Sequence, residues 1–158
     1  MTHRLIETNK TFSKILVAIE ESRTSTSSAR AIDYAIKVAR DYDAQLIILH
    51  VIRSSNINLQ SMSLPSYVIE MKKRIQSSFV KITEKIHEES DKQNVVRMKT
   101  EIVASSRIAD AIVNYARDKH MDLIVVGSRG RSKLKSMLLG SVASDVVRYA
   151  HCPVLTVK

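Results

Sequence analysis

Glycine is the residue that this sequence most lacks. The 158 residues include only three glycines, where average usage would give about 11. All three lie in one stretch, GSRGRSKLKSMLLGS, which runs from Gly127 to Ser141. The positions at which the main chain can approach another group most closely are therefore concentrated in a single short segment.

Cysteine and long apolar runs are also scarce. The single cysteine, Cys152, cannot form an internal disulfide, and the first thirty residues contain no apolar run of the signal-peptide type. The longest aliphatic runs, such as residues 15–19, fall far short of the ~20 residues that a membrane helix needs. We therefore expect a soluble, cytoplasmic protein without a membrane segment.

Acidic residues are outnumbered, since 16 Asp and Glu stand against 25 Lys and Arg, for a formal net charge of +9. This balance favours anionic partners. The absence of tryptophan and the presence of only two phenylalanines disfavour nucleic acid, because binders of single strands usually add stacking aromatic side chains to a basic groove. A nucleotide phosphate and an acidic protein surface both remain open.

Short apolar segments alternate along the chain with segments of helical periodicity. Continuous apolar runs predict buried strands, and residues 96–102 alternate apolar with charged side chains, which predicts a half-exposed edge strand. The other strands are expected at residues 14–20, 45–52, 122–126 and 153–157, the last of them also at a sheet edge. Apolar residues at helical spacing predict helices around residues 29–39, 75–86, 108–115 and 142–147, with Ser105 or Ser106 capping the third.

Strict alternation of strands and helices predicts the fold class. Parallel neighbours are joined by right-handed crossovers, so the chain should form a doubly wound α/β fold, with helices on both faces of a five-stranded parallel sheet. We expect residues 1–12 to be an N-terminal extension and residues 13–158 to be a single domain.

The glycine-containing stretch lies where such a fold binds ligands. In open α/β sheets this place is outside the carboxyl ends of the strands, and Gly127 follows the strand at 122–126. Gly140 precedes the last helix, whose N-terminal N–H groups favour an anion, and Ser141 adds a hydroxyl. The spacing is G-x2-G-x9-G-S, which is neither the P-loop nor the G-x-G-x-x-G fingerprint.

This spacing after an aliphatic fourth strand resembles the nucleotide-binding signature of universal stress proteins. The opening strand KILVAIEES, the second strand ending in LHVI and the closing HCPVLTV are similar to the same family, so the resemblance covers nearly the whole chain. It implies a sheet of order 3-2-1-4-5, with ATP bound between the ends of strands one and four. It also implies a homodimer that pairs through the final strand, residues 153–157.

The resemblance further implies three groups of nucleotide contacts. Adenosine would be held by Ala18, Ile19, Glu20 and Leu46. The ribose and phosphate path would be lined by Val126, Gly127, Arg129 and Gly130. Phosphate oxygens would be bound by Gly140, Ser141, Val142 and Ala143.

The chain departs from the family where it has Glu20 and Glu21, because the family usually has Asp followed by a small or apolar residue. His50 lies near the end of the second strand, but no nucleophile or ligand set accompanies it in the sequence, so a packed or hydrogen-bonded histidine is preferred over a catalytic one. His151 and Cys152 are adjacent, yet two residues do not make a metal site.

We therefore expect an ATP-binding stress protein that signals to an unknown protein partner and has no catalytic residues and no metal ligands of its own. AMP or cyclic AMP in place of ATP, and Mg²⁺ beside the nucleotide, are left open. One alternative is an enzyme that hydrolyses ATP, slowly or otherwise, or transfers its adenylyl group. The other is a module that binds nucleic acid or protein and no nucleotide.

Overall fold

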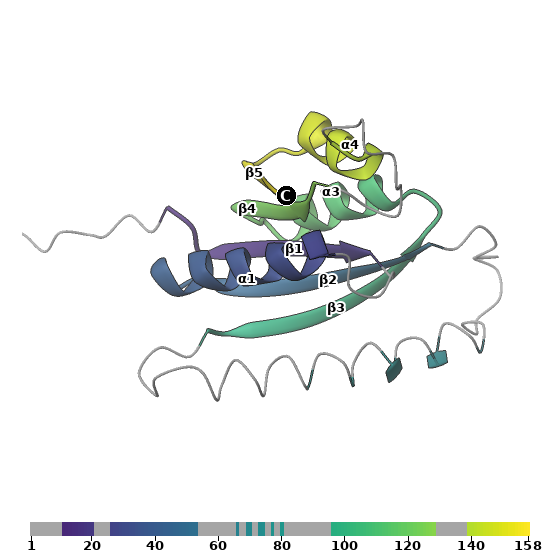
Figure 1. Ribbon diagram of the computed structural model, residues 1–158, viewed down its shortest axis with the longest axis horizontal. Coiled ribbons are helices and arrows are strands. Elements are labelled where there is room, and N and C mark those ends of the chain that lie inside the picture. The colour runs from purple at the N-terminus through teal and green to yellow at the C-terminus, as the bar shows by residue number, and fades with distance from the viewer. Residues whose placement is uncertain are drawn as a thin grey trace, which may run out of the picture.

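The computed structural model describes residues 11–20, 26–53, 96–128 and 139–158, with isolated residues between 66 and 80. Its strands form one parallel sheet of order β3-β2-β1-β4-β5 (Figure 1). The strands are β1 (Lys14–Glu20), β2 (Gln45–Arg53), β3 (Met98–Ser105), β4 (Leu123–Gly127) and β5 (Val154–Val157). The expected five-stranded sheet and its strand order are confirmed.

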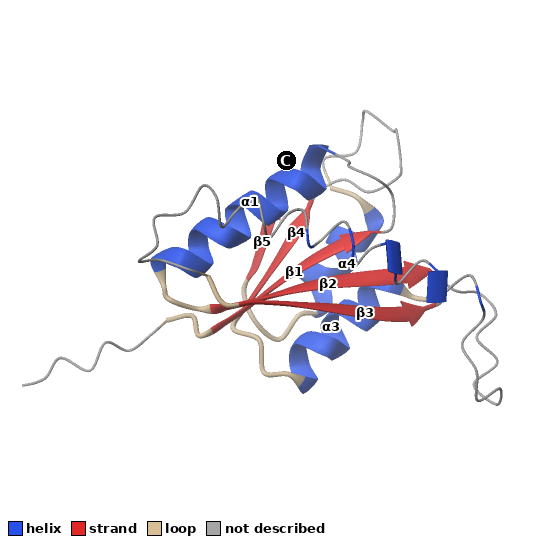
Figure 2. Ribbon diagram, turned by 90° about the horizontal axis from the view of Figure 1, so that it is seen from below, coloured by secondary structure: helices blue, strands red, loops and turns tan. Residues whose placement is uncertain are grey.

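Helices cover both faces of the sheet. Helix α1 (Thr26–Asp41) lies on one side, and α3 (Ile108–Asp118) and α4 (Ser141–Tyr149) lie on the other (Figure 2). The helix predicted around residues 75–86 falls largely outside the described residues; those that are described between 66 and 80 are helical. The doubly wound arrangement is confirmed.

The core is two apolar layers separated by the sheet. In β1, Ile15 and Val17 pack against α1, whereas Leu16 and Ala18 pack against α3 and α4. Successive side chains of a strand point to opposite faces, so a central strand with helices on both sides has to be apolar at every position. This explains the uninterrupted apolar run ILVAI at residues 15–19.

The predicted half-exposed strand is an edge strand. Within β3, Lys99 is exposed and the other residues are half-buried, and among the described strands β3 pairs with β2 alone. Lys99 Nζ and Glu101 Oε1 form an ion pair at 2.6 Å on one face of the strand. The alternation at residues 96–102 thus correctly predicted an edge strand. The strand itself begins at Met98, two residues later than the alternation.

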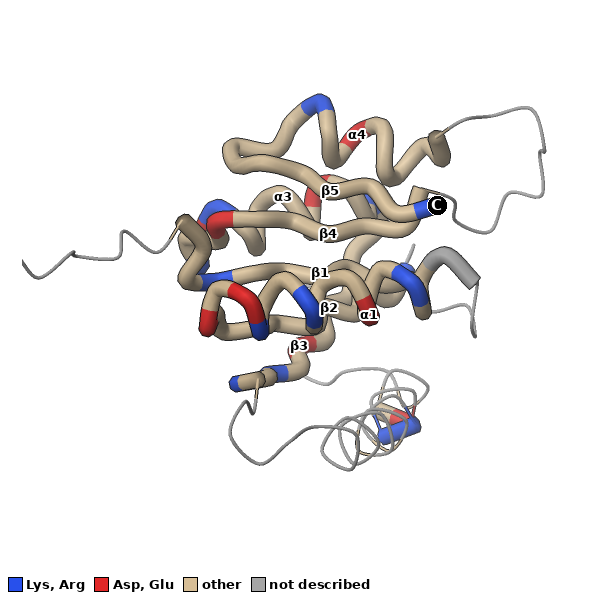
Figure 3. Tube along the Cα trace, turned by 60° about the vertical axis from the view of Figure 1, so that its left-hand side comes forward, with Lys and Arg blue, Asp and Glu red and all other residues tan. Residues whose placement is uncertain are grey.

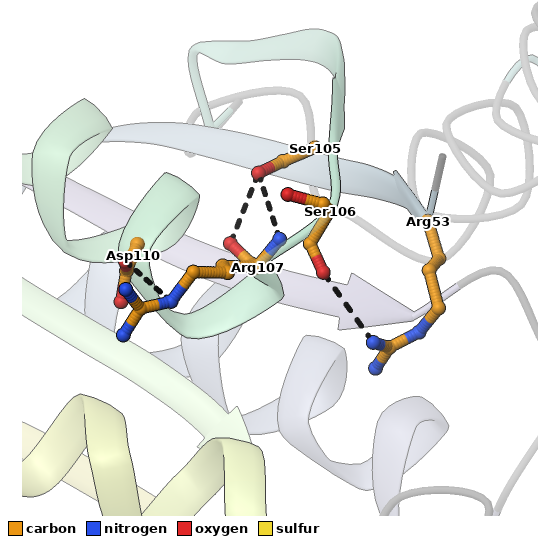
Figure 4. Close-up of polar contacts among 5 residues, drawn as sticks. All are labelled: Arg53, Ser105, Ser106, Arg107 and Asp110. Carbon is orange, nitrogen blue, oxygen red and sulfur yellow. Dashed lines mark hydrogen bonds and ion pairs between the residues drawn. The ribbon is translucent and has the colours of Figure 1, made fainter. Parts of the chain in front are cut away.

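The cap predicted for α3 is different in the structure. Arg107 is the N-cap residue, and no side chain caps the helix. Ser105 still belongs to β3, and its Oγ accepts a hydrogen bond from Arg107 N and donates one to Arg107 O, both at 3.1 Å (Figure 4). The prediction of Ser105 or Ser106 as the cap is therefore wrong, because the serine hydroxyl closes a local turn instead.

Asp122 joins the first and fourth strands at the amino edge of the sheet. One oxygen of its carboxylate accepts hydrogen bonds from Ser13 N and Lys14 N, each at 2.8 Å. These bonds hold the residue before β4 against the start of β1, and Ile15 then lies opposite Leu123. The amino-edge register determines which residues of β1 and β4 meet at the carboxyl edge.

No helix in the described ranges combines the length and the apolar character that crossing a membrane requires.

Candidate functional site at the carboxyl edge of β1 and β4

The carboxyl ends of β1 and β4 lie side by side at the centre of the sheet. Ala18 is opposite Val126, and on the other side of β1, Glu20 is opposite Val51. The chain leaves β1 through α1 toward β2, whereas β4 leads through α4 to β5 on the far side (Figure 1). This divergence is the switch point at which open α/β sheets bind ligands.

Helix α4 begins at this edge with a glycine. Gly140 is the N-cap, with φ −70° and ψ 159°, and it has no side chain with which to cap the helix. The first helical bond is donated by Ser144 N to Gly140 O at 2.9 Å. The preceding N–H groups in the first turn have no carbonyl within the helix to bind, so they are available to an acceptor from outside.

The backbone angles of Gly140 do not require glycine, since they lie in the extended region open to every residue. What glycine provides here is the absence of a Cβ atom, which leaves room directly in front of the helix. A compact group with several acceptor oxygens fits such a position, because the N–H groups and the positive end of the helix dipole both favour it. Phosphate is the group of this kind that helix N-termini most often bind.

Ser128 connects the end of β4 to the start of α4. Its N–H donates to Val157 O at 2.6 Å, and its carbonyl accepts from Gly140 N at 2.7 Å. Its side chain is only 1% exposed, and Oγ has no hydrogen-bond partner among the described residues. The main chain of Ser128 is thus fully bonded while its buried hydroxyl is not.

Most of the expected contact residues meet at this edge. They are Ala18, Ile19 and Glu20 on β1, Val126 and Gly127 on β4, and Gly140, Ser141, Val142 and Ala143 at the start of α4. The side chains of Val126 and Ala143 are buried between the sheet and its helices, so only their main chains are available at the edge. Arg129 and Gly130 lie outside the described residues.

The structure does not bring Leu46 to this edge. Leu46 pairs with Ile15 at the beginning of β2, its N–H donates to Arg97 O, and its side chain is fully buried under α1. The β2 residue level with Glu20 is Val51, five positions further on, or about 16 Å along the strand. We therefore leave Leu46 out of the proposed site and replace it with Val51.

His50 lies one residue before Val51 and is buried, with 4% of its surface exposed. Neither ring nitrogen has a hydrogen-bond partner in the described part of the chain. Burial without a partner disfavours the charged imidazolium, so it lowers the pKa of His50 from 6.5 to about 4. The imidazole is neutral at physiological pH and buried, in agreement with the packed histidine expected from the sequence.

Two arginine side chains at the carboxyl edge of the sheet contact neighbouring residues. Arg53, at the end of β2, donates to the main-chain oxygen of Ser106 at 3.5 Å, and Arg107 Nε pairs with Asp110 Oδ2 at 2.9 Å (Figure 4). Within the described ranges, no cluster of three or more His, Cys, Asp or Glu side chains could hold a metal ion.

Two residues of the site were missed in the sequence. Ser128 follows the run LIVVG and continues its alternation with Ile124 and Val126, which was the available signal for a buried position. Val51 was missed because residues 46–52 are aliphatic at every position except His50, so their pattern does not show which residue stands at the strand exit.

Together the sheet order and this edge define a doubly wound α/β protein with an uncapped helix N-terminus at its switch point. Comparison with known proteins agrees with the sequence resemblance: residues 11–158 match the universal stress protein family. The chain belongs to this family.

Individual relatives align over nearly the full chain. Universal stress protein YxiE of Bacillus subtilis is 38% identical over 152 residues, which cover 93% of this chain and 99% of YxiE. The solved structure of MJ0577 from Methanocaldococcus jannaschii has a TM-score of 0.67 at 28% identity, covering 94% of this chain and 96% of that one. A universal stress protein crystallised in complex with cAMP has a TM-score of 0.56 at 27% identity, covering 92% and 96%.

Proposed function

We propose that this universal stress protein binds ATP at the carboxyl edge of β1 and β4, and that nucleotide occupancy is signalled to a protein partner. The observation that carries the proposal is the start of α4. Gly140 leaves the first turn uncapped and free of a Cβ atom at the switch point of the sheet. A relative that was solved with cAMP supports an adenine nucleotide as the ligand class.

The phosphates would lie against α4 and the nucleoside against β1. Main-chain N–H groups of Ser141, Val142 and Ala143 would donate to phosphoryl oxygens, with the exposed Ser141 hydroxyl beside them. The main chain at the end of β1, in Ala18, Ile19 and Glu20, would face the adenosine, with Val51 level with Glu20 on β2. From the glycine motif, we also assign Arg129 and Gly130 to the phosphate path.

We propose binding and signalling rather than rapid catalysis. Burial near this edge lowers the pKa of His50 strongly, so its ring is neutral. Among the described residues, neither ring nitrogen is hydrogen-bonded to a nucleophile. A general base needs a proton within hydrogen-bond reach. Steady ATP turnover on the order of 1 s⁻¹ or faster would instead place the protein among ordinary enzymes.

The proposed assembly is a cytoplasmic homodimer that pairs through β5. This strand is at the edge of the sheet, and its residues Val154 and Leu155 are only half-buried. Helix α4, which packs beside β5, exposes 48% of Val147 and 56% of Tyr149. An open strand edge beside exposed apolar side chains favours pairing with a second copy.

A test of the site is calorimetric titration of ATP into the wild-type protein and a Gly140→Val variant. We expect saturable binding by the wild type and a loss of about 100-fold or more in the variant, because the valine side chain occupies the space before the α4 amides. AMP and cyclic AMP, titrated in parallel, establish which adenylate is preferred.

The matched control is Arg107→Val, which places the same side chain at the N-cap of α3. Both N-cap residues have extended backbone angles, so valine is compatible with either main chain. The control should bind ATP like the wild type. Equal isotherms for wild type and Gly140→Val would overturn the assignment of phosphate to α4.

A further inference from the structure

The pattern of main-chain bonds indicates which face of the sheet carries the side chain of Ser128. Ile124 N and Ser128 N both donate to carbonyls of the β5 segment, those of Pro153 and Val157, so Ser128 continues the alternation of β4. Its side chain therefore lies on the same face as Ile124 and Val126, whose neighbours include Ala143 of α4. The bond from Gly140 N to Ser128 O places the first turn of α4 next to it.

The Ser128 hydroxyl has no hydrogen-bond partner among the described residues, and it lies in the protein interior, where an unpaired polar group lowers stability. It is 1% exposed, so surface water does not replace a missing partner, and no described residue supplies one. Buried polar groups in native proteins are nearly always hydrogen-bonded. A buried hydroxyl without a partner among the described residues therefore needs its own explanation.

The neighbouring groups determine what kind of partner would complete the site. The first-turn N–H groups of α4 are donors, and the Ser128 hydroxyl does not cap them. A hydroxyl can donate as well as accept. A group that offers acceptor oxygens only, such as a phosphoryl group, satisfies the N–H groups and the hydroxyl together.

We propose that Ser128 Oγ donates a hydrogen bond to a phosphoryl oxygen of the nucleotide bound at the start of α4. This inference rests on the proposed nucleotide-binding function and adds a ligand contact that the glycine motif does not contain. Ser128 then remains unsatisfied in the free protein and becomes satisfied in the complex.

The test measures nucleotide affinity and the stability of the free protein for Ser128→Ala. A hydrogen bond to a charged oxygen is among the stronger ones, so ATP affinity should fall about 10- to 100-fold. Affinity for adenosine, which has no phosphate, should not change. The melting temperature of the free variant should equal or exceed that of the wild type, because no hydrogen bond is lost and an unpaired polar group is removed.

Two further variants test whether a change in ATP affinity is due to the loss of the Ser128 hydroxyl itself. Ser128→Thr keeps a donor at this position and should retain most of the ATP affinity. Ser13→Ala removes an exposed serine hydroxyl at the opposite edge of the sheet and should change neither quantity.

Each outcome bears on a different claim. Wild-type affinity for ATP in Ser128→Ala overturns the contact and leaves the proposed function standing. A free Ser128→Ala protein that unfolds at lower temperature, or fails to fold, also overturns it, because the hydroxyl then has a structural partner. A wild-type protein that binds no adenylate overturns the proposed function and this inference together.

Discussion

His50 combines a titratable ring with burial near the carboxyl edge of the sheet. Its ring lies on the α1 face of β2, since it is two residues beyond Ile48, which packs in the α1 layer. The ring has no hydrogen-bond partner in the described part of the chain. His50 thus contributes packing as a neutral side chain, and protonation would place a charge in an apolar layer.

This burial predicts that the protein loses stability in mild acid. The folded-state pKa of about 4 lies below the ordinary 6.5, so between these values the unfolded chain binds a proton that the folded chain does not. The contribution of His50 is complete above pH 6.5, declines as the pH falls from 6.5 toward 4, and is lost below 4. The free energy of unfolding lost through His50 over this pH range is about 3 kcal/mol.

The measurement is urea unfolding of wild type and His50→Leu at a series of pH values from 7 to 4. Leucine does not titrate, so the free energy of unfolding of the variant should fall less steeply over this range, whatever its value at pH 7. His151→Gln changes an exposed histidine and should keep the wild-type slope. Parallel slopes for wild type and His50→Leu would contradict the assignment.

At the scale of elements, one row of β5 main-chain groups pairs with no other strand in the described part of the chain. The carbonyls of Pro153 and Val157 bond to the β4 side, and successive residues of a strand direct these groups to opposite sides. Val154 and Thr156 therefore direct theirs away from the sheet. These are the groups that a second copy of β5 would bind in the proposed dimer.

Thr156→Pro is expected to convert the dimer to a monomer while the fold is retained. Proline removes the N–H of an exposed residue whose main chain faces outward, and prolines are tolerated on edge strands for this reason. Size-exclusion chromatography with light scattering gives the mass. Thr156→Ala keeps the N–H and should remain dimeric, and a dimeric Thr156→Pro protein would exclude pairing through this edge.

The sequence predicted the elements better than their ends. The apolar runs of β1, β2 and β4 and the alternation of β3 identified the strands, because burial of one or both faces imposes these patterns. The same patterns do not show which residue lies at the carboxyl end of a strand. Leu46 was therefore placed at the wrong end of β2, and a serine was expected to cap α3 where the chain uses Arg107.

The candidate site was predicted in part for a related reason. Gly140 and Ser141 stand at a helix start that local sequence marks clearly, and the structure places them there. Ser128 was not predicted, because its importance depends on bonds to Val157 and Gly140, which lie 29 and 12 residues further along the chain. Such pairing follows from the assembled sheet and is not visible in periodicity.

For the whole molecule, the formal net charge of the sequence is +9, and the described ranges show how part of this charge is distributed. Basic and acidic positions are interspersed on the helices and near the strand ends, and the strand interiors carry few charges (Figure 3). A net positive charge attracts small polyanions in general. The choice among them would then depend on the local geometry at α4.

Native mass spectrometry of gently purified protein tests ligand and assembly together. We expect a species of twice the 17.8 kDa chain mass with up to two adenylates attached, one for each site. Gly140→Val should give the dimer mass without nucleotide, and Thr156→Pro should give a single chain that retains its nucleotide. A bare monomer for the wild type would contradict both parts of the proposal.

The position of Asp122 has a consequence for folding. Its bond to Lys14 N joins residues that are 108 positions apart, and it lies on the same strand pair whose carboxyl ends form the candidate site. Closing so long a loop makes this pairing one of the slow, non-local steps of folding. Because β1 and β4 come together only when most of the chain has been synthesised, a nucleotide held between them would select completed molecules and protect them against unfolding by mass action.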